Sequence, residues 1–142
     1  MIAFPPSSLH LTLKAEHAAL GPRIAELRAL LAREFSWDDA RIALVDLRKT
    51  LKLHFALEES GGYLAEVLAC APELAQTVAK LESDHSRMCG SLARLLAEAL
   101  VARERAELRQ SVSEFLDVLA VHEHGENAVA QRALMTDVPG GD

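Results

Sequence analysis

Apolar side chains, mostly leucine, recur every three or four residues along most of this chain, with polar side chains between them. This spacing places the apolar positions on one face of an α-helix. Four such stretches cover about residues 9–35, 37–69, 72–101 and 105–134. They predict an all-α fold in which four helices, joined by short turns, form an antiparallel up-down-up-down bundle. Residues 135–142 lack the pattern and are expected to be a disordered tail.

Local signals place two of the three turns. Ser36 precedes two acidic residues, a combination typical of a helix start. Pro72 suits the first position of a helix, because no amide donor is needed there. Two interruptions remain inside the predicted helices. Gly21-Pro22 predicts a kink in the first helix, or else a helix that begins only at Pro22, and Gly61-Gly62 weakens the last two turns of the second.

Length, composition and charge narrow the class of protein. The chain has 142 residues, the size of one ordinary domain, and is 50% hydrophobic and 25% charged. The net charge of −6 and the scattered basic residues argue against binding to nucleic acid or to an anionic membrane surface. Two cysteines without a CxxC motif exclude a disulfide framework and a zinc ribbon. With no apolar run near ~18 residues, we expect a soluble, cytoplasmic protein with a single domain over 1–142.

Six histidine and glutamate residues form two copies of one pattern. Each copy has a histidine, a second histidine 37 residues later and a glutamate four residues after that. The first copy is His17, His54 and Glu58, and the second is His85, His122 and Glu126. An offset of 68 residues relates the copies and also pairs apolar positions such as Leu47 and Phe115. The chain is therefore predicted to contain two copies of one helical hairpin.

The four histidines of the repeat are expected to share one layer. In antiparallel helices, two residues lie at one height when they are equally far from the turn between them. The midpoint of the first two histidines, 35.5, is beside Ser36, and that of the second and third, 69.5, is close to Pro72. The repeat then places the fourth histidine in the same layer and the third turn near Arg103.

Both histidine–glutamate pairs are expected to face the core. His54 and Glu58 continue the apolar stripe of their helix. His122 and Glu126 do the same in the last helix. Four imidazoles and two carboxylates would be very costly to bury without compensation, so we expect metal ions among them. Such ligands suit iron, manganese or zinc, and two carboxylates, each one turn beyond a histidine, suit a pair of ions.

The ordered set of His17, HFALE at 54–58, His85 and HEHGE at 122–126 resembles the hemerythrin-like family of HHE cation-binding domains. The resemblance spans about residues 9–134 and implies a four-helix bundle around two non-haem iron ions. It implies that the two histidines of each copy bind one iron. Glu58 and Glu126 would bridge the two ions together with an oxo or hydroxo group.

Two positions depart from the oxygen-carrying members of that family. Those proteins have a second histidine four residues after the one on the third helix, where this chain has Cys89. They also end on an aspartate five residues after the last histidine, whereas Glu126 follows by four. Each metal would keep an open position. We expect binding or sensing of O2 or NO, redox chemistry or iron handling, with an unidentified redox or signalling partner, in place of reversible oxygen carriage.

Several assignments stay open from the sequence alone. Cys89 suits a small core residue or a ligand, and Glu59 a solvated residue or an extra ligand. Tyr63 suits a packing residue or a hydrogen-bond donor near one metal. Ferritin-type bundles use two Glu-x-x-His motifs, and in this chain only Glu82 and His85 have that spacing. The chain therefore fits the ferritin-type class poorly.

The alternative to a metal protein is a metal-free helical interaction module whose core histidines are structural. His124 and its neighbour Glu123 are expected on the surface, because they point away from His122 on the helix. His10 lies on the same helix face as His17 and is either near the site or at a frayed end. No acid, base or nucleophile stands out beyond the metal residues, so enzymatic turnover is not predicted.

Overall fold

The computed structural model describes the backbone of residues 8–60, 63–101 and 104–134, and the side chains within these ranges from Ala18 to Ala133. These ranges contain α-helices, one short 3₁₀ helix and no strand, so the predicted all-α class is confirmed. The elements are α1 (Ser8–Leu31), α2 (Trp37–Glu59), α3 (Tyr63–Cys70), η1 (Pro72–Leu74), α4 (Ala75–Val101) and α5 (Arg105–Leu134). No helix within these ranges has the length and apolar character needed to cross a bilayer.

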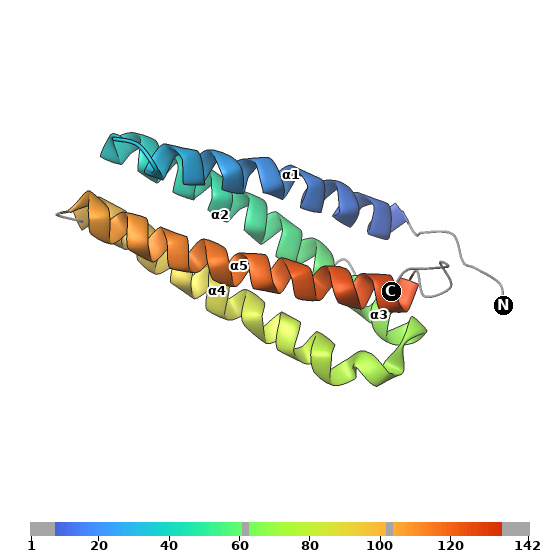
Figure 1. Ribbon diagram of the computed structural model, residues 1–142. Coiled ribbons are helices and arrows are strands. Elements are labelled where there is room, and N and C mark those ends of the chain that lie inside the picture. The colour runs from blue at the N-terminus through green and yellow to red at the C-terminus, as the bar shows by residue number, and fades with distance from the viewer. Residues whose placement is uncertain (1–7, 61–62, 102–103, 135–142) are drawn as a thin grey trace.

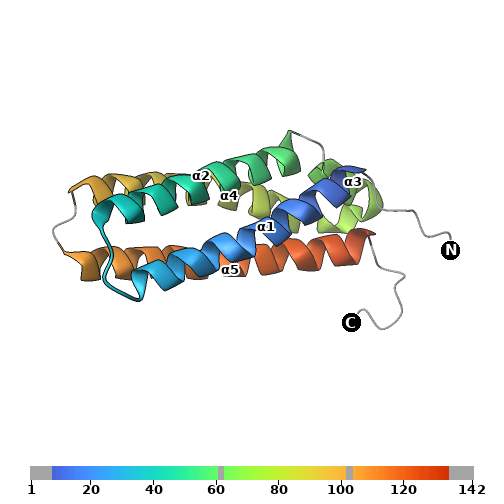
Figure 2. The same cartoon turned by 90° about the horizontal axis from the view of Figure 1, so that it is seen from above.

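The four long helices lie alongside one another. Successive long helices are in contact, α1 with α2, α2 with α4 and α4 with α5, and α1 also touches α5. Figure 1 shows the chain running back and forth along them, with α3 at the end of the molecule where α1 begins and α5 ends. The view from above in Figure 2 shows α1 crossing over α5. The middles of α2, α4 and α5 therefore face a common interior.

The helix predicted over residues 37–69 is divided. α2 ends at Glu59, Ser60 caps it by donating its backbone N–H to the carbonyl of Ala56, and a separate α3 begins at Tyr63. Two successive glycines follow Ser60, and each costs a helix about 1 kcal/mol relative to alanine. Residues 61–62, the predicted turn residue Arg103 and the predicted tail 135–142 lie outside the described residues.

The first helix continues through its proline. α1 includes Gly21 and Pro22, so the alternative of a helix that begins at Pro22 is wrong, while the kink stays a prediction. The helix ends at Leu31, four residues before the predicted limit. The predicted start at Ser36 is confirmed, because its side chain accepts a hydrogen bond from the backbone N–H of Asp39 at 3.0 Å.

The first turn of α5 anchors the corner between α1 and α2. Arg109 donates from Nε to the carbonyl of Leu31 at 2.6 Å and from Nη2 to that of Arg33 at 2.9 Å. Arg105 donates to the carbonyl of Phe35 at 2.8 Å. The last carbonyls of a helix have no partner within it. The two arginines supply donors at this corner and tie α5 to the first hairpin.

A polar layer divides the apolar core. Buried apolar side chains form a larger cluster toward the α1–α2 corner and a smaller one around α3. Along α4, buried His85 lies between Leu81 of the smaller cluster and Met88 of the larger one. Along α5, His122 and Glu126 occupy the same interval. The layer is enclosed by apolar side chains on both sides.

Truncating a side chain of the larger cluster should destabilise the fold far more than truncating an exposed one. Leu119 is fully buried, so Leu119→Ala is expected to lower the free energy of unfolding by about 2–5 kcal/mol. Val121, on the same helix, is 75% exposed, and Val121→Ala should stay within about 0.5 kcal/mol. Guanidinium unfolding followed by circular dichroism checks both. Equal losses would contradict this description of the core.

Candidate metal centre

Three helices bring five of the six predicted ligands into one buried layer. Each residue is at most 4% exposed: His54, Glu58, His85, His122 and Glu126. They come from α2, α4 and α5, and each lies on the face that continues the apolar stripe of its helix. Five polar residues are therefore enclosed by the core.

The carboxylates link histidines within and between helices. His54 Nε2 lies 2.7 Å from Glu58 Oε1, and His122 Nε2 lies 2.6 Å from Glu126 Oε1. Between helices, Glu126 Oε1 is 3.6 Å from His54 Nε2, and Glu58 Oε2 is 3.6 Å from His85 Nε2. Each glutamate thus faces the Nε2 atoms of two histidines from different helices.

Six polar atoms of the two glutamates and of two histidines have no hydrogen-bond partner among the described residues. These buried atoms are both carboxylate oxygens of Glu58 and of Glu126, and Nε2 of His85 and of His122. The two Nε2–oxygen distances below 3 Å do not have the angles of hydrogen bonds. Buried carboxylates are compensated by donors or by cations, and imidazole and carboxylate atoms together bind metals such as iron. The residues present therefore fit a metal centre.

The ligand atoms converge in two groups of three. His85, His122 and Glu126 form one, and His54, Glu58 and Glu126 form the other, with the atoms of each group within 4.8 Å of one another. Glu126 belongs to both groups, as a bridging carboxylate does. Glu58 also faces His85 of the other group. The layer thus contains two overlapping groups of candidate cation ligands.

The sixth predicted ligand, His17, is not placed at the same level of detail. It lies in α1, but its side chain and that of His10 are outside the described part of the chain. The ligand role of His17 stays a prediction from the repeat.

Two acidic residues lie at the outer, Nδ1 side of the histidines. Glu59 Oε2 is 3.1 Å from His85 Nδ1, and Asp84 Oδ2 is 3.6 Å from His122 Nδ1. The sequence leaves Glu59 as a solvated residue or an extra ligand, and the structure shows a third role, that of a hydrogen-bond partner of a candidate ligand. The position of Asp84 beside His122 is not predicted from the sequence. The sequence signal for both acids is that each is next to a candidate ligand, Glu59 to Glu58 and Asp84 to His85. Each acid nevertheless contacts a histidine of a neighbouring helix.

Glu123 and His124 are both predicted on the surface, and this is wrong for Glu123. Its side chain is 15% exposed, and its Oε1 lies 3.5 Å from His54 Nε2, whereas His124 is exposed. Burial raises the pKa of Glu123 to about 7; nearby His54 lowers it and Glu58 raises it. Its carboxyl group thus reaches into the interior toward α2, although Glu123 lies beside the inward face of α5. The layer thus contains a third carboxyl group.

Aromatic rings and burial shape the His85–His122 end. The Phe55 ring stacks on His85 with centroids 4.0 Å apart and planes 11° apart, and meets His122 edge-on at 5.8 Å. Burial, with a contribution from His85, lowers the pKa of His122 to about 4, although Asp84 acts to raise it. His122 is therefore a neutral imidazole at neutral pH, the form that binds metals.

Two of the residues with open assignments pack in the apolar clusters. Tyr63 is buried, and its pKa is raised by burial and then by Glu58 and Glu66. Its hydroxyl stays protonated at neutral pH. Cys89 is partly buried against the larger cluster and is not in either converging group of described ligand atoms. This position is that of a packing residue.

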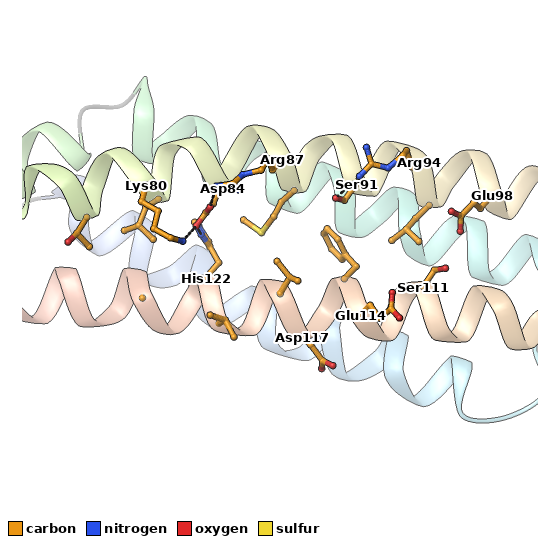
Figure 3. A pocket seen from close by; sticks show the side chains of 18 residues that line it. Lys80, Asp84, Arg87, Ser91, Arg94, Glu98, Ser111, Glu114, Asp117 and His122 are labelled. Carbon is orange, nitrogen blue, oxygen red and sulfur yellow. Dashed lines mark hydrogen bonds and ion pairs between the residues drawn. The ribbon is translucent and has the colours of Figure 1, made fainter.

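A groove between α4 and α5 reaches the outer side of the layer. Its volume is about 850 Å³, and it is lined by apolar side chains, charged side chains and His122. Figure 3 shows Asp84 in it, pointing toward Lys80 and His122. Burial alone would raise the pKa of Asp84, but Lys80, His122 and Arg87 together hold it below its usual value. An ionised carboxylate therefore lies between the groove and His122.

The family model of the hemerythrin HHE cation binding domain matches residues 9–134, nearly the whole chain. No curated protein and no solved structure matches the chain.

The raised pKa of Glu123 should make the metal-free protein less stable as pH increases. Between its ordinary value of 4.5 and about 7, the folded protein holds a proton that the unfolded chain has released. The free energy of unfolding therefore falls as pH rises through this window. In the wild-type protein the free energy of unfolding should fall by about 2 kcal/mol between pH 5 and 8, and Glu123→Gln should remove this fall.

Chemical unfolding of both proteins in chelator, at several pH values, tests this. The lowered pKa of His122 acts in the opposite direction between pH 6.5 and about 4. Because both proteins retain His122, the difference between them isolates Glu123. Parallel stability curves for the two proteins would contradict the prediction.

Proposed function

We propose, because this chain belongs to the hemerythrin HHE cation-binding domain family, that it is a non-haem diiron protein. Its four long helices would form the antiparallel bundle of that family. The ions would bind to four histidines and two glutamates: His17, His54, Glu58, His85, His122 and Glu126. Manganese or zinc could use the same ligands.

One observation carries the proposal. Both oxygens of Glu58 and of Glu126 are buried and have no hydrogen-bond donor among the described residues, and each carboxylate lies against imidazole nitrogens. Removing two carboxylates from water costs several kcal/mol each unless charge compensates them. Two cations at the converging groups would supply that charge, and the shared Glu126 favours a pair of ions over a single one.

The site supports binding a small ligand better than acting on a large substrate. An iron pair supplies electron transfer and binding of molecules such as O2 or NO. The layer is enclosed by two apolar clusters, and the groove approaches it from outside only at His122. We therefore propose binding or sensing of O2 or NO, or a role in iron or redox handling, with a redox or signalling partner. A cytoplasmic setting stays a prediction from the sequence.

Metal analysis and an absorption spectrum of aerobically purified protein test this function. We expect about two irons per chain and near-ultraviolet bands of an oxo-bridged pair. His54→Ala and Glu58→Ala should each lose at least one iron, because each removes a ligand from the converging groups. His124→Ala is the matched control, since His124 is exposed and two residues from a ligand.

The opposite result would favour the metal-free interaction module. A protein without metal, whose thermal stability does not rise on adding ferrous iron under anaerobic conditions, would rule out the diiron function. Loss of iron in His124→Ala equal to that in His54→Ala would rule out the ligand assignment. Two zinc or manganese ions in place of iron would keep the site and change its chemistry.

A further inference from the structure

His85 is held from two sides by residues of α2. The Phe55 ring lies parallel to the imidazole at 4.0 Å, and Glu59 Oε2 lies 3.1 Å from Nδ1. Phe55 and Glu59 are four residues apart, so one turn of α2 presents both to the same histidine. Together they fix the plane of the ring and its rotation within that plane.

Glu59 differs from Asp84 in what else it contacts. Asp84 forms ion pairs with Lys80 at 3.1 Å and with Arg87 at 2.8 Å. Its distance of 3.6 Å to His122 Nδ1 is longer than a hydrogen bond. For Glu59, His85 is the partner that the described residues provide. The charge of Glu59 is therefore available to the imidazole.

This contact sets which nitrogen of His85 can bind a metal. A hydrogen on Nδ1 is donated to Glu59, which leaves the lone pair on Nε2, the atom that faces Glu58 at 3.6 Å. A carboxylate behind a metal-binding imidazole fixes the tautomer and strengthens the imidazole as a ligand. Glu59 is half exposed, so it can do this without being a buried charge itself.

We propose that Glu59 is a positioning residue for His85 and thereby strengthens one of the two metal positions. The inference rests on the proposed metal centre. The 68-residue repeat supports the restriction to one position, because it pairs Glu59 with Asn127, which carries no charge, and Phe55 with Glu123. The two halves of the chain thus supply the same candidate ligands but different surroundings, and the two metal positions are unequal.

Metal retention by the isolated, metal-loaded protein tests the proposal. Wild-type protein and variants are loaded with Zn²⁺ and equilibrated with increasing EDTA, and the zinc retained per chain is counted. Glu59→Gln should weaken one of the two binding steps about 10-fold and leave the other unchanged. Glu59→Ala, which removes the acceptor as well as the charge, should weaken the same step by up to about 100-fold.

Glu82→Gln is the control, because it makes the same change at an exposed position of α4. A structural role at the end of α2 would lower thermal stability and both binding steps together, and that result would overturn the proposal. So would retention equal to wild type in Glu59→Ala. A wild-type protein that retains no zinc would overturn the metal centre as well, whereas two retained ions with unchanged steps would overturn only the role of Glu59.

Discussion

Two buried carboxylates constrain the rest of this structure. Glu58 and Glu126 lie within a few ångströms of three imidazoles and receive no hydrogen bond from the described residues. An uncompensated buried carboxylate is among the most unfavourable groups that a core can contain. Positive charge in this layer would therefore stabilise the fold, so the stability of the protein is linked to its capacity to bind cations. Metal uptake should accordingly contribute to folding free energy.

That constraint explains the division of the core. The apolar cluster toward the α1–α2 corner is large, and Arg105 and Arg109 close it by satisfying carbonyls of the corner. Its residues come from all four long helices. The smaller cluster around α3 has fewer buried residues, and it lies beyond the layer. The end of the molecule that contains α3 therefore depends most on what occupies the layer.

The sequence predicts most of the helical segments and brings five candidate ligands together, because both depend on spacing along one chain. The 37- and 68-residue intervals, with the N-cap at Ser36 and the turn before Pro72, place side chains of different helices at one height. It could not predict contacts that depend on how closely helices approach and how they rotate. Glu123 lies beside the inward face, and its carboxyl group reaches across the interior to His54 of α2. The contact of Glu59 with His85 likewise requires α2 and α4 at their actual separation.

The end of α2 at Glu59 has a consequence for the charge balance of the layer. The peptide dipoles of a helix add up to a partial negative charge at its carboxyl end. Glu58 is the second-last residue of α2, and the helix stops there instead of continuing to Leu68. The break thus places a helix C-terminus beside the candidate ligands. This would add a favourable field for a bound cation of about 0.3–1 kcal/mol per charge, whereas the C-terminus of a helix that continued to Leu68 would lie about 14 Å farther away.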